Sequence, residues 1–183
     1  MLFHASETQN IKILRPINGT HNKTWVYAAF DIYMSAFFLH RYGRGYTFDY
    51  RRNQVTGVPV LYELFPGAFD LRYKETAGSI YIISEESFFK GTNWREELVS
   101  EITVPVLSEI PIENVREYLL YLDKIQKIKI SFFSDRNETE QHILDRFRHE
   151  RKQLIKTGIS TDDLFDFLSK HLPNIVEKVF TDD

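Results

Sequence analysis

The spacing of apolar positions changes near residue 110, and the two halves predict different elements. Before that point, short β-branched and aromatic runs are separated by Gly, Pro and Asn, a pattern typical of strands joined by turns. An early helix is also predicted, because Asp31 can cap it and apolar residues follow at helical spacing as far as Leu39. The predicted strands are Leu2–His4, Trp25–Ala28, Val58–Phe65, Ser79–Ile83 and Leu98–Val104.

After residue 110, apolar residues recur every three or four positions, which indicates amphipathic helices. The predicted helices begin at Glu113, at Asn137 and at Ser160, and a short fourth helix runs from Asn174 to Val179. A cation in the last turn followed by glycine predicts that the second of them ends at Lys156-Thr157-Gly158.

Strands first and helices second predict an α+β fold. We expect an α+β core over residues 1–108 and a helical extension over residues 109–183. No Gly-, Ser- or Pro-rich spacer lies between the two parts. The extension is therefore expected to pack on the side of the core instead of hanging on a linker.

Composition narrows the class of protein. Apolar residues make up 43% of the 183 residues and charged residues 27%, which suits a domain with a core and a charged surface. A net charge of −3 argues against a protein that coats nucleic acid. The absence of cysteine excludes disulfides and thiol chemistry and fits a reducing cytoplasm, where we expect the protein. The N-terminus has no signal-peptide pattern, and the longest apolar stretch, Tyr33–Leu39, is too short to span a bilayer.

The first strand carries the candidate chemistry. Neither of the glycine-rich phosphate-binding motifs Gly-x-Gly-x-x-Gly and Gly-x-x-x-x-Gly-Lys-Ser/Thr occurs, so a nucleotide would have to bind to a different kind of site. His4 and Ser6 lie two residues apart and point to the same side of a strand, which places an imidazole beside a hydroxyl and suits binding of a ribose. The ordinary alternatives are a hydrogen-bonded core histidine at His4 and a turn or helix cap at Ser6.

The segments Leu2-Phe3-His4-Ala5-Ser6 and Trp25-Val26-Tyr27-Ala28-Ala29 resemble two strands of the ADP-ribosyltransferase-like fold. Leu14-Arg15-Pro16, the helix after Asp31 and Gly78-Ser79-Ile80-Tyr81 resemble further segments of that fold. The resemblance covers residues 1–108. It implies a mixed β core with one early helix, and it leaves the C-terminal helices outside.

The resemblance also implies a function, in which NAD is a substrate whose ADP-ribose is transferred or hydrolysed. In this fold the histidine, here His4, bonds a ribose hydroxyl, and a neighbouring hydroxyl, here Ser6, assists. An aromatic ring stacks on the nicotinamide, and Tyr27 and Tyr81 are the candidates, although both also suit a strand core. Ala29 stands where many relatives carry a hydroxyl, and no arginine-serine-glutamate pattern is present, which disfavours the arginine-modifying branch.

A glutamate of the fold stabilises the cationic ribose as nicotinamide leaves, because breaking the glycosidic bond builds positive charge on the sugar. Glu97 and Glu101 compete for this role, and each also suits an ordinary solvated surface position. Glu101 is preferred, because it enters the Ile-Thr-Val-Pro strand directly and a strand end holds a carboxylate rigidly.

Two further clusters are candidate sites. Arg41 and Arg44 lie in a basic, glycine-rich and aromatic segment and can contact a pyrophosphate, or simply end a helix with cations. His142, His149 and His171 lack the supporting carboxylates or spacing of a metal site, so no metal is predicted.

Two functions therefore compete. The first is an NAD- or nucleotide-binding protein, with a nucleotide-like small molecule as its partner. The second is a non-catalytic α+β module that binds a protein partner or a second copy through its C-terminal helices. An open cleft lined by His4, Ser6, Tyr27 and a glutamate favours the first, and burial of these groups in a core favours the second.

Overall fold

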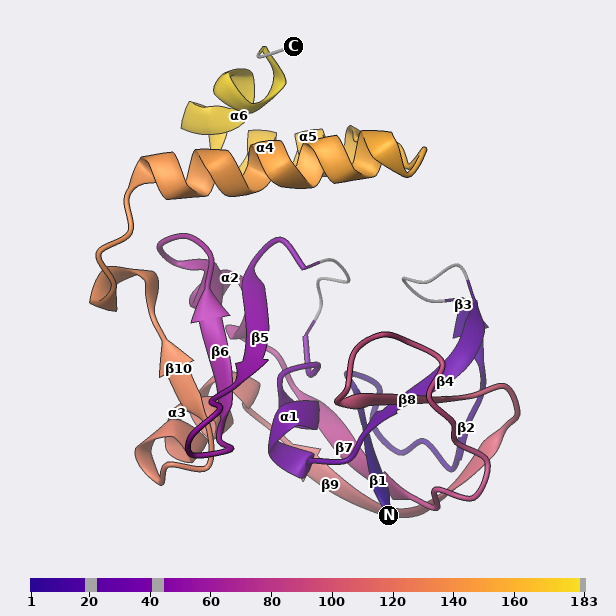
Figure 1. Cartoon of the computed structure of the whole chain (residues 1–183). Coiled ribbons are helices and arrows are strands. Elements are labelled where there is room, and N and C mark those ends of the chain that lie inside the picture. The colour runs from indigo at the N-terminus through magenta and orange to yellow at the C-terminus, as the bar shows by residue number, and fades with distance from the viewer. Residues whose placement is uncertain (19–22, 41–44, 182–183) are drawn as a thin grey trace. The chain divides into compact units, whose positions relative to one another are not determined.

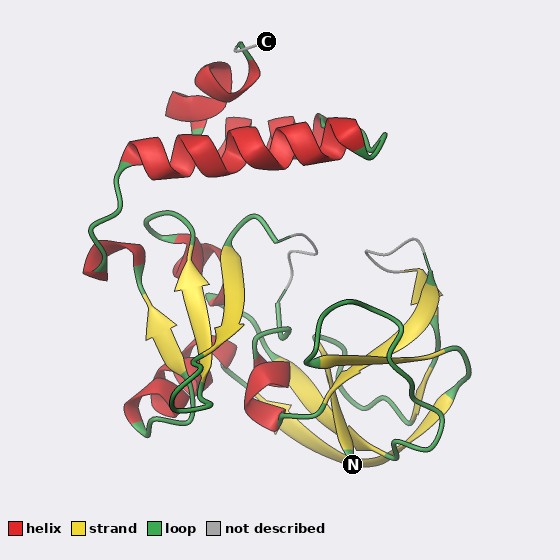
Figure 2. Ribbon diagram, in the orientation of Figure 1, coloured by secondary structure: helices red, strands yellow, loops and turns green. Residues whose placement is uncertain are grey.

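The computed structural model describes residues 1–18, 23–40 and 45–181. The chain forms two compact units, Met1–Phe133 and Ser134–Asp183, each of which is described by itself (Figure 1). The first unit combines strands and helices, and the described part of the second is helical (Figure 2). The predicted α+β class is therefore confirmed.

Seven antiparallel strands form the curled main sheet of the first unit. The order across this sheet is β2-β9-β7-β1-β4-β3, and β8 also pairs with β4. One face buries an apolar cluster that includes Leu2, Val26, Tyr81 and Leu98. The strands are β1 (Leu2–Ser6), β2 (Ile13–Leu14), β3 (Ile17–Asn18), β4 (Thr24–Ala29), β7 (Gly78–Ile83), β8 (Glu97–Ser100) and β9 (Val104–Ile112).

A second, three-stranded sheet has the order β10-β6-β5. Its strands are β5 (Phe48–Arg52), β6 (Pro59–Glu63) and β10 (Lys129–Ser131), and β10 runs parallel to β6. Three helices accompany the two sheets: α1 (Ile32–Ala36), α2 (Ala68–Tyr73) and α3 (Val115–Lys124). Helix α1 contacts β1 and β4 of the main sheet as well as α3.

A buried carboxylate ties the second sheet to its neighbours. Glu63, at the end of β6, accepts the backbone N–H of Phe69 in α2 and that of Phe133, both at 2.9 Å. Both oxygens therefore have backbone donors, as a buried carboxylate requires. The 3₁₀ turn η1 (Phe133–Asp135) begins at this point.

Most of the predicted strands are confirmed within one or two residues of their ends. The predicted strand Leu98–Val104 is two strands, β8 and β9, because Ser100 turns the chain by accepting the N–H of Ile102 at 3.4 Å. Helix α1 is shorter than predicted, but Asp31 does cap it by accepting the N–H of Tyr33 at 2.8 Å. Elements β5, α2 and β10 were not predicted, because each is short and mixes apolar with charged residues.

The second unit consists of α4 (Glu140–Lys156), α5 (Asp162–His171) and α6 (Pro173–Phe180). Helix α4 begins with a capping box between Thr139 and His142, and its predicted end is confirmed by Gly158, whose φ of 70° continues the chain in the left-handed region. Helix α6 contacts both α4 and α5. No helix in the described ranges is both long and apolar enough to cross a membrane.

The two units divide the chain further along than the sequence pattern suggests. The expected boundary after residue 108 falls inside β9, and both α3 and β10 belong to the first unit. The reason is pairing: β9 pairs with β7 from Val106 to Ile112, and β10 completes the second sheet. That the helical part packs on the core stays a prediction.

Candidate functional site

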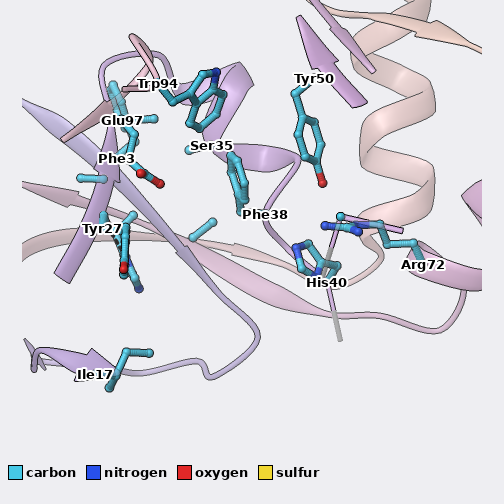
Figure 3. Close-up of a pocket in the computed structure, with 15 residues that line it drawn as sticks. Phe3, Ile17, Tyr27, Ser35, Phe38, His40, Tyr50, Arg72, Trp94 and Glu97 are labelled. Atoms are coloured by element: carbon cyan, nitrogen blue, oxygen red, sulfur yellow. Dashed lines mark hydrogen bonds between the residues drawn. The ribbon is translucent and has the colours of Figure 1, made fainter. Parts of the chain in front are cut away.

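A cavity of about 420 Å³ lies in the first unit. It has the size of an ordinary small-molecule pocket. Figure 3 shows Glu97 and Tyr27 at one end, Phe38 and Trp94 in the middle, and His40, Tyr50 and Arg72 at the other end. The lining residues are Phe3, His4, Ala5, Ile17, Tyr27, Ala28, Ala29, Ser35, Phe38, His40, Gly45, Tyr50, Arg72, Trp94 and Glu97.

Strand register brings the first end together. Phe3 of β1 pairs with Ala29 of β4, and Ala29 pairs in turn with Glu97 of β8. Directly paired residues of antiparallel strands share a face of the sheet. Tyr27 lies two residues before Ala29 and joins the same face. A carboxylate and a tyrosine ring therefore line one side of the cavity.

His4 enters the cavity in a different way. It pairs with Tyr81 of β7 and so belongs to the face opposite Phe3. In the described strands, β1 and β4 pair at one position, Phe3 with Ala29. Next to that position, Nδ1 of His4 donates to the carbonyl oxygen of Tyr27 at 2.7 Å and so links the two strands with a side chain.

This hydrogen bond fixes the protonation of His4. A carbonyl oxygen only accepts, so the proton lies on Nδ1. Burial lowers the pKa of His4, although the bond to Tyr27 opposes that effect, so the ring is neutral at pH 7. In a neutral ring with a proton on Nδ1, Nε2 carries a lone pair. His4 can thus accept a hydrogen bond from a hydroxyl group through Nε2.

The two candidate acids occupy different places. Glu97 begins β8 and lines the cavity, whereas Glu101 is exposed, lies outside the lining and accepts from the indole N–H of Trp25 at 3.4 Å. The cause is the turn after Ser100, which ends β8 and carries Glu101 away from the sheet. The structure therefore brings Glu97, and not the preferred Glu101, to His4 and Tyr27.

An ionic cluster holds the chain next to Glu97. Arg52 of β5 donates through Nε to Glu96 at 2.9 Å, its Nη2 contacts the second oxygen of the same carboxylate at 2.5 Å, and its Nη1 contacts Asp31 at 3.0 Å. These bonds, first of all those to Glu96, raise the pKa of Arg52, so its charge is permanent. The cluster ties the start of α1, strand β5 and the entry to β8 around one guanidinium.

Aromatic rings form the middle of the cavity. The ring of Phe38 lies 5.2 Å from that of Tyr50 and 5.6 Å from that of Trp94, measured between ring centres. Such spacing is typical of packed aromatic side chains. The rings give the cavity an apolar, flat-sided wall that suits a planar ligand group.

The far end was missed by sequence reasoning. Arg72 is 2% exposed, lines the cavity and donates through Nη1 to the hydroxyl of Thr47 at 2.6 Å. His40 lies beside it. Burial first, and the charge of Arg72 second, lower the pKa of His40 to about 3. One signal in the sequence could have indicated this end. Arg72 lies among the buried apolar positions of Ala68–Tyr73, and an arginine on the buried side of a helix is rare unless it has a partner or a function.

Four more of the predicted site residues lie outside the cavity lining or outside the described residues. Ser6 does not line the cavity, because its hydroxyl accepts the N–H of Thr8 at 3.1 Å and forms the turn that the sequence left as an alternative. Tyr81 is 0% exposed and also lies outside the lining, with its hydroxyl donating to the carbonyl of Thr8 at 2.7 Å. Arg41 and Arg44 lie outside the described residues.

Within the described ranges, no three His, Cys, Asp or Glu side chains are grouped to hold a metal ion. No protein-family model, curated protein or solved structure matches the chain. The resemblance to the ADP-ribosyltransferase-like fold consequently rests on the strand motifs of the sequence.

Proposed function

We propose that the first unit binds NAD or a related nucleotide in the cavity beside β1, β4 and β8. One observation carries the proposal: His4, Tyr27 and Glu97 line the same cavity next to the point where β1 and β4 pair. A hydroxyl acceptor, an aromatic ring and a carboxylate are the groups that bind a ribose and stabilise positive charge on it.

The roles follow from the chemistry of each group. Nε2 of His4 accepts a hydrogen bond from a ribose hydroxyl, while its Nδ1 still donates to the carbonyl oxygen of Tyr27. Glu97 stabilises the cationic ribose that forms as nicotinamide leaves, since a fixed carboxylate interacts more strongly with the charged transition state than with neutral substrate. A water molecule or an acceptor group then takes the ADP-ribose.

Calorimetric titration of the full chain with NAD, ADP-ribose and nicotinamide tests the proposal. We expect saturable binding of NAD and ADP-ribose, and a His4→Ala variant that folds but binds both at least tenfold more weakly. Glu101→Gln, in the turn after β8 and outside the cavity lining, is the control and should bind as wild type does. Absence of binding by all three ligands would remove the nucleotide function.

Turnover is a separate question. Release of nicotinamide from NAD by wild-type protein would support transferase or hydrolase chemistry. Binding without release would assign the cavity to recognition alone.

The second candidate function, a non-catalytic module, draws support from the helical unit. Ile155, Ile159 and Phe165 are exposed there, at 53%, 43% and 47%. Exposed apolar residues of this kind suit contact with a protein partner or a second copy. Light scattering of the purified chain would detect self-association, and Phe165→Ser should reverse it.

A further inference from the structure

The end of the cavity away from Glu97 carries a buried positive charge. Arg72 projects from α2, and its guanidinium carbon lies 5.7 Å from the ring centre of Tyr50 and 5.9 Å from that of Phe48. Its hydrogen bond to Thr47 and these rings help to hold the guanidinium in place beside the cavity. A cavity wall of this kind has a positive potential that buried surroundings strengthen.

A second polar group at this end is left incomplete. Nδ1 of His40 is buried and has no hydrogen-bond partner within the described parts of the chain. A buried polar atom without a partner is costly, so such an atom in a cavity is a position where a ligand can bind. Figure 3 shows the hydroxyl of Tyr50 pointing toward Arg72 and His40.

We propose that Arg72, His40 and the hydroxyl of Tyr50 form an anion subsite, which takes a phosphate group of the ligand. This inference deepens the proposed function and rests on it, because it makes the ligand a phosphorylated nucleotide and excludes a bare nucleoside. In a nucleotide the ribose links the base to the phosphate, so the phosphate lies at the Arg72 end and the ribose bonded to it lies between Arg72 and Glu97.

The chemistry of the three groups fits a phosphate. The guanidinium fork matches two phosphate oxygens, and hydrogen bonds between ions of opposite charge are among the strongest in proteins. A hydroxyl donates to a third oxygen. Nδ1 of His40 can direct an N–H at the anion, and an entering negative charge offsets the effect of Arg72, the second cause that keeps this ring neutral.

Inorganic pyrophosphate tests the subsite without any nucleoside. We expect the full chain to bind pyrophosphate and ADP, and to bind adenosine at least tenfold more weakly than ADP. Arg72→Gln should weaken the binding of pyrophosphate and ADP by on the order of 10- to 100-fold, since loss of a charged hydrogen bond has an effect of that size. It should leave the affinity for adenosine unchanged. Arg51→Gln is the matched control, because Arg51 is exposed on β5 and paired with Asp49.

His40→Phe decides the outcome if Arg72→Gln does not fold, as circular dichroism and thermal melting would show. This variant keeps a ring of similar size and should lose several-fold affinity for pyrophosphate and ADP. Equal pyrophosphate binding by the wild type and the folded variants would overturn the subsite, as would equal affinity of the wild type for adenosine and ADP.

The two proposals fail in different ways. Pyrophosphate binding that depends on Arg72, without any binding of NAD or ADP-ribose, would keep the anion subsite and remove the NAD function. Binding of NAD that depends on His4 but not on Arg72 or His40 would keep the NAD function and remove the subsite.

Discussion

The two ends of the cavity are assembled in different ways. Phe3, Tyr27 and Glu97 come from neighbouring strands of one sheet, so the backbone ladder sets their positions. His40, Tyr50 and Arg72 come from the segment after α1, from β5 and from α2, which share no ladder with one another. A strand motif in the sequence can therefore predict the first end, which we call the strand-built end. The second end, which we call the packed end, depends only on packing between separate segments.

The difference also extends to charge. At the strand-built end, a histidine whose Nδ1 is already bonded lines the same cavity as a carboxylate. At the packed end, the charge of Arg72 adds to burial and lowers the pKa of His40 to about 3. The ends thus favour ligand groups of opposite character, a developing cation on one side and an anion on the other.

The largest expected effect concerns the carboxylate of the strand-built end. If NAD is turned over, Glu97→Gln should lower the rate of nicotinamide release by on the order of 10² to 10³, as loss of a transition-state partner does. NAD affinity and melting temperature should change little. Glu101→Gln is the control and should keep the wild-type rate; a loss confined to Glu101→Gln would return the role to that residue.

The next effect concerns the backbone that carries His4. A Cβ atom at Gly78 would lie 2.6 Å from the carbonyl oxygen of Ser6 and 2.9 Å from Cδ2 of Leu39, so Gly78→Ala forces β1 and β7 apart. We expect a loss of about 1–3 kcal/mol in the free energy of unfolding, measured by urea denaturation. Gly45→Ala, with no atom within 4 Å, should have nearly wild-type stability.

Because of His40 at the packed end, we expect the stability of the protein to depend on pH. The folded pKa of His40, about 3, lies below its ordinary value of 6.5, so the folded state resists a proton that the unfolded chain accepts. The contribution of His40 to the free energy of unfolding is fully present above about pH 6.5. It declines as the pH falls toward 3, by up to about 1.4 kcal/mol per pH unit.

His40→Phe should remove that part of the decline between pH 6.5 and 4, as melting curves would show. The variant retains the contribution of His4, whose pKa is also lowered by burial, so some pH dependence should persist in it. Identical pH profiles for the two proteins would contradict a neutral, buried His40.

The smallest effect separates Tyr81 from the site. Its hydroxyl donates to the carbonyl of Thr8 and accepts the N–H of Ile11 at 3.2 Å, so it holds the loop after β1. Tyr81→Phe should lower the free energy of unfolding by about 0.5–1.5 kcal/mol and leave NAD affinity unchanged. A large loss of NAD affinity in a stable Tyr81→Phe protein would restore Tyr81 to the ligand site.

Local patterns predicted most elements, because their causes are local. Runs of β-branched and aromatic residues predicted β1, β4 and β7, and the cap at Asp31 and the stop at Gly158 were predicted from single residues. The short elements β5, α2 and β10 were missed. Strand β10 depends on β6, which is distant in sequence, whereas β5 pairs with β6 across a short loop and was missed because its residues mix apolar with charged side chains.

By itself, the sequence determined the α+β class, the early strand with His4 and the later strand with Tyr27. The tertiary structure decided which groups lie together. Glu97 and not Glu101 lines the cavity, Ser6 lies in a turn, and Arg72 lies beside His40. The physical reason is that secondary structure follows side-chain periodicity along a few residues. Strand register, turn geometry and helix packing instead depend on contacts between segments that only the folded chain brings together.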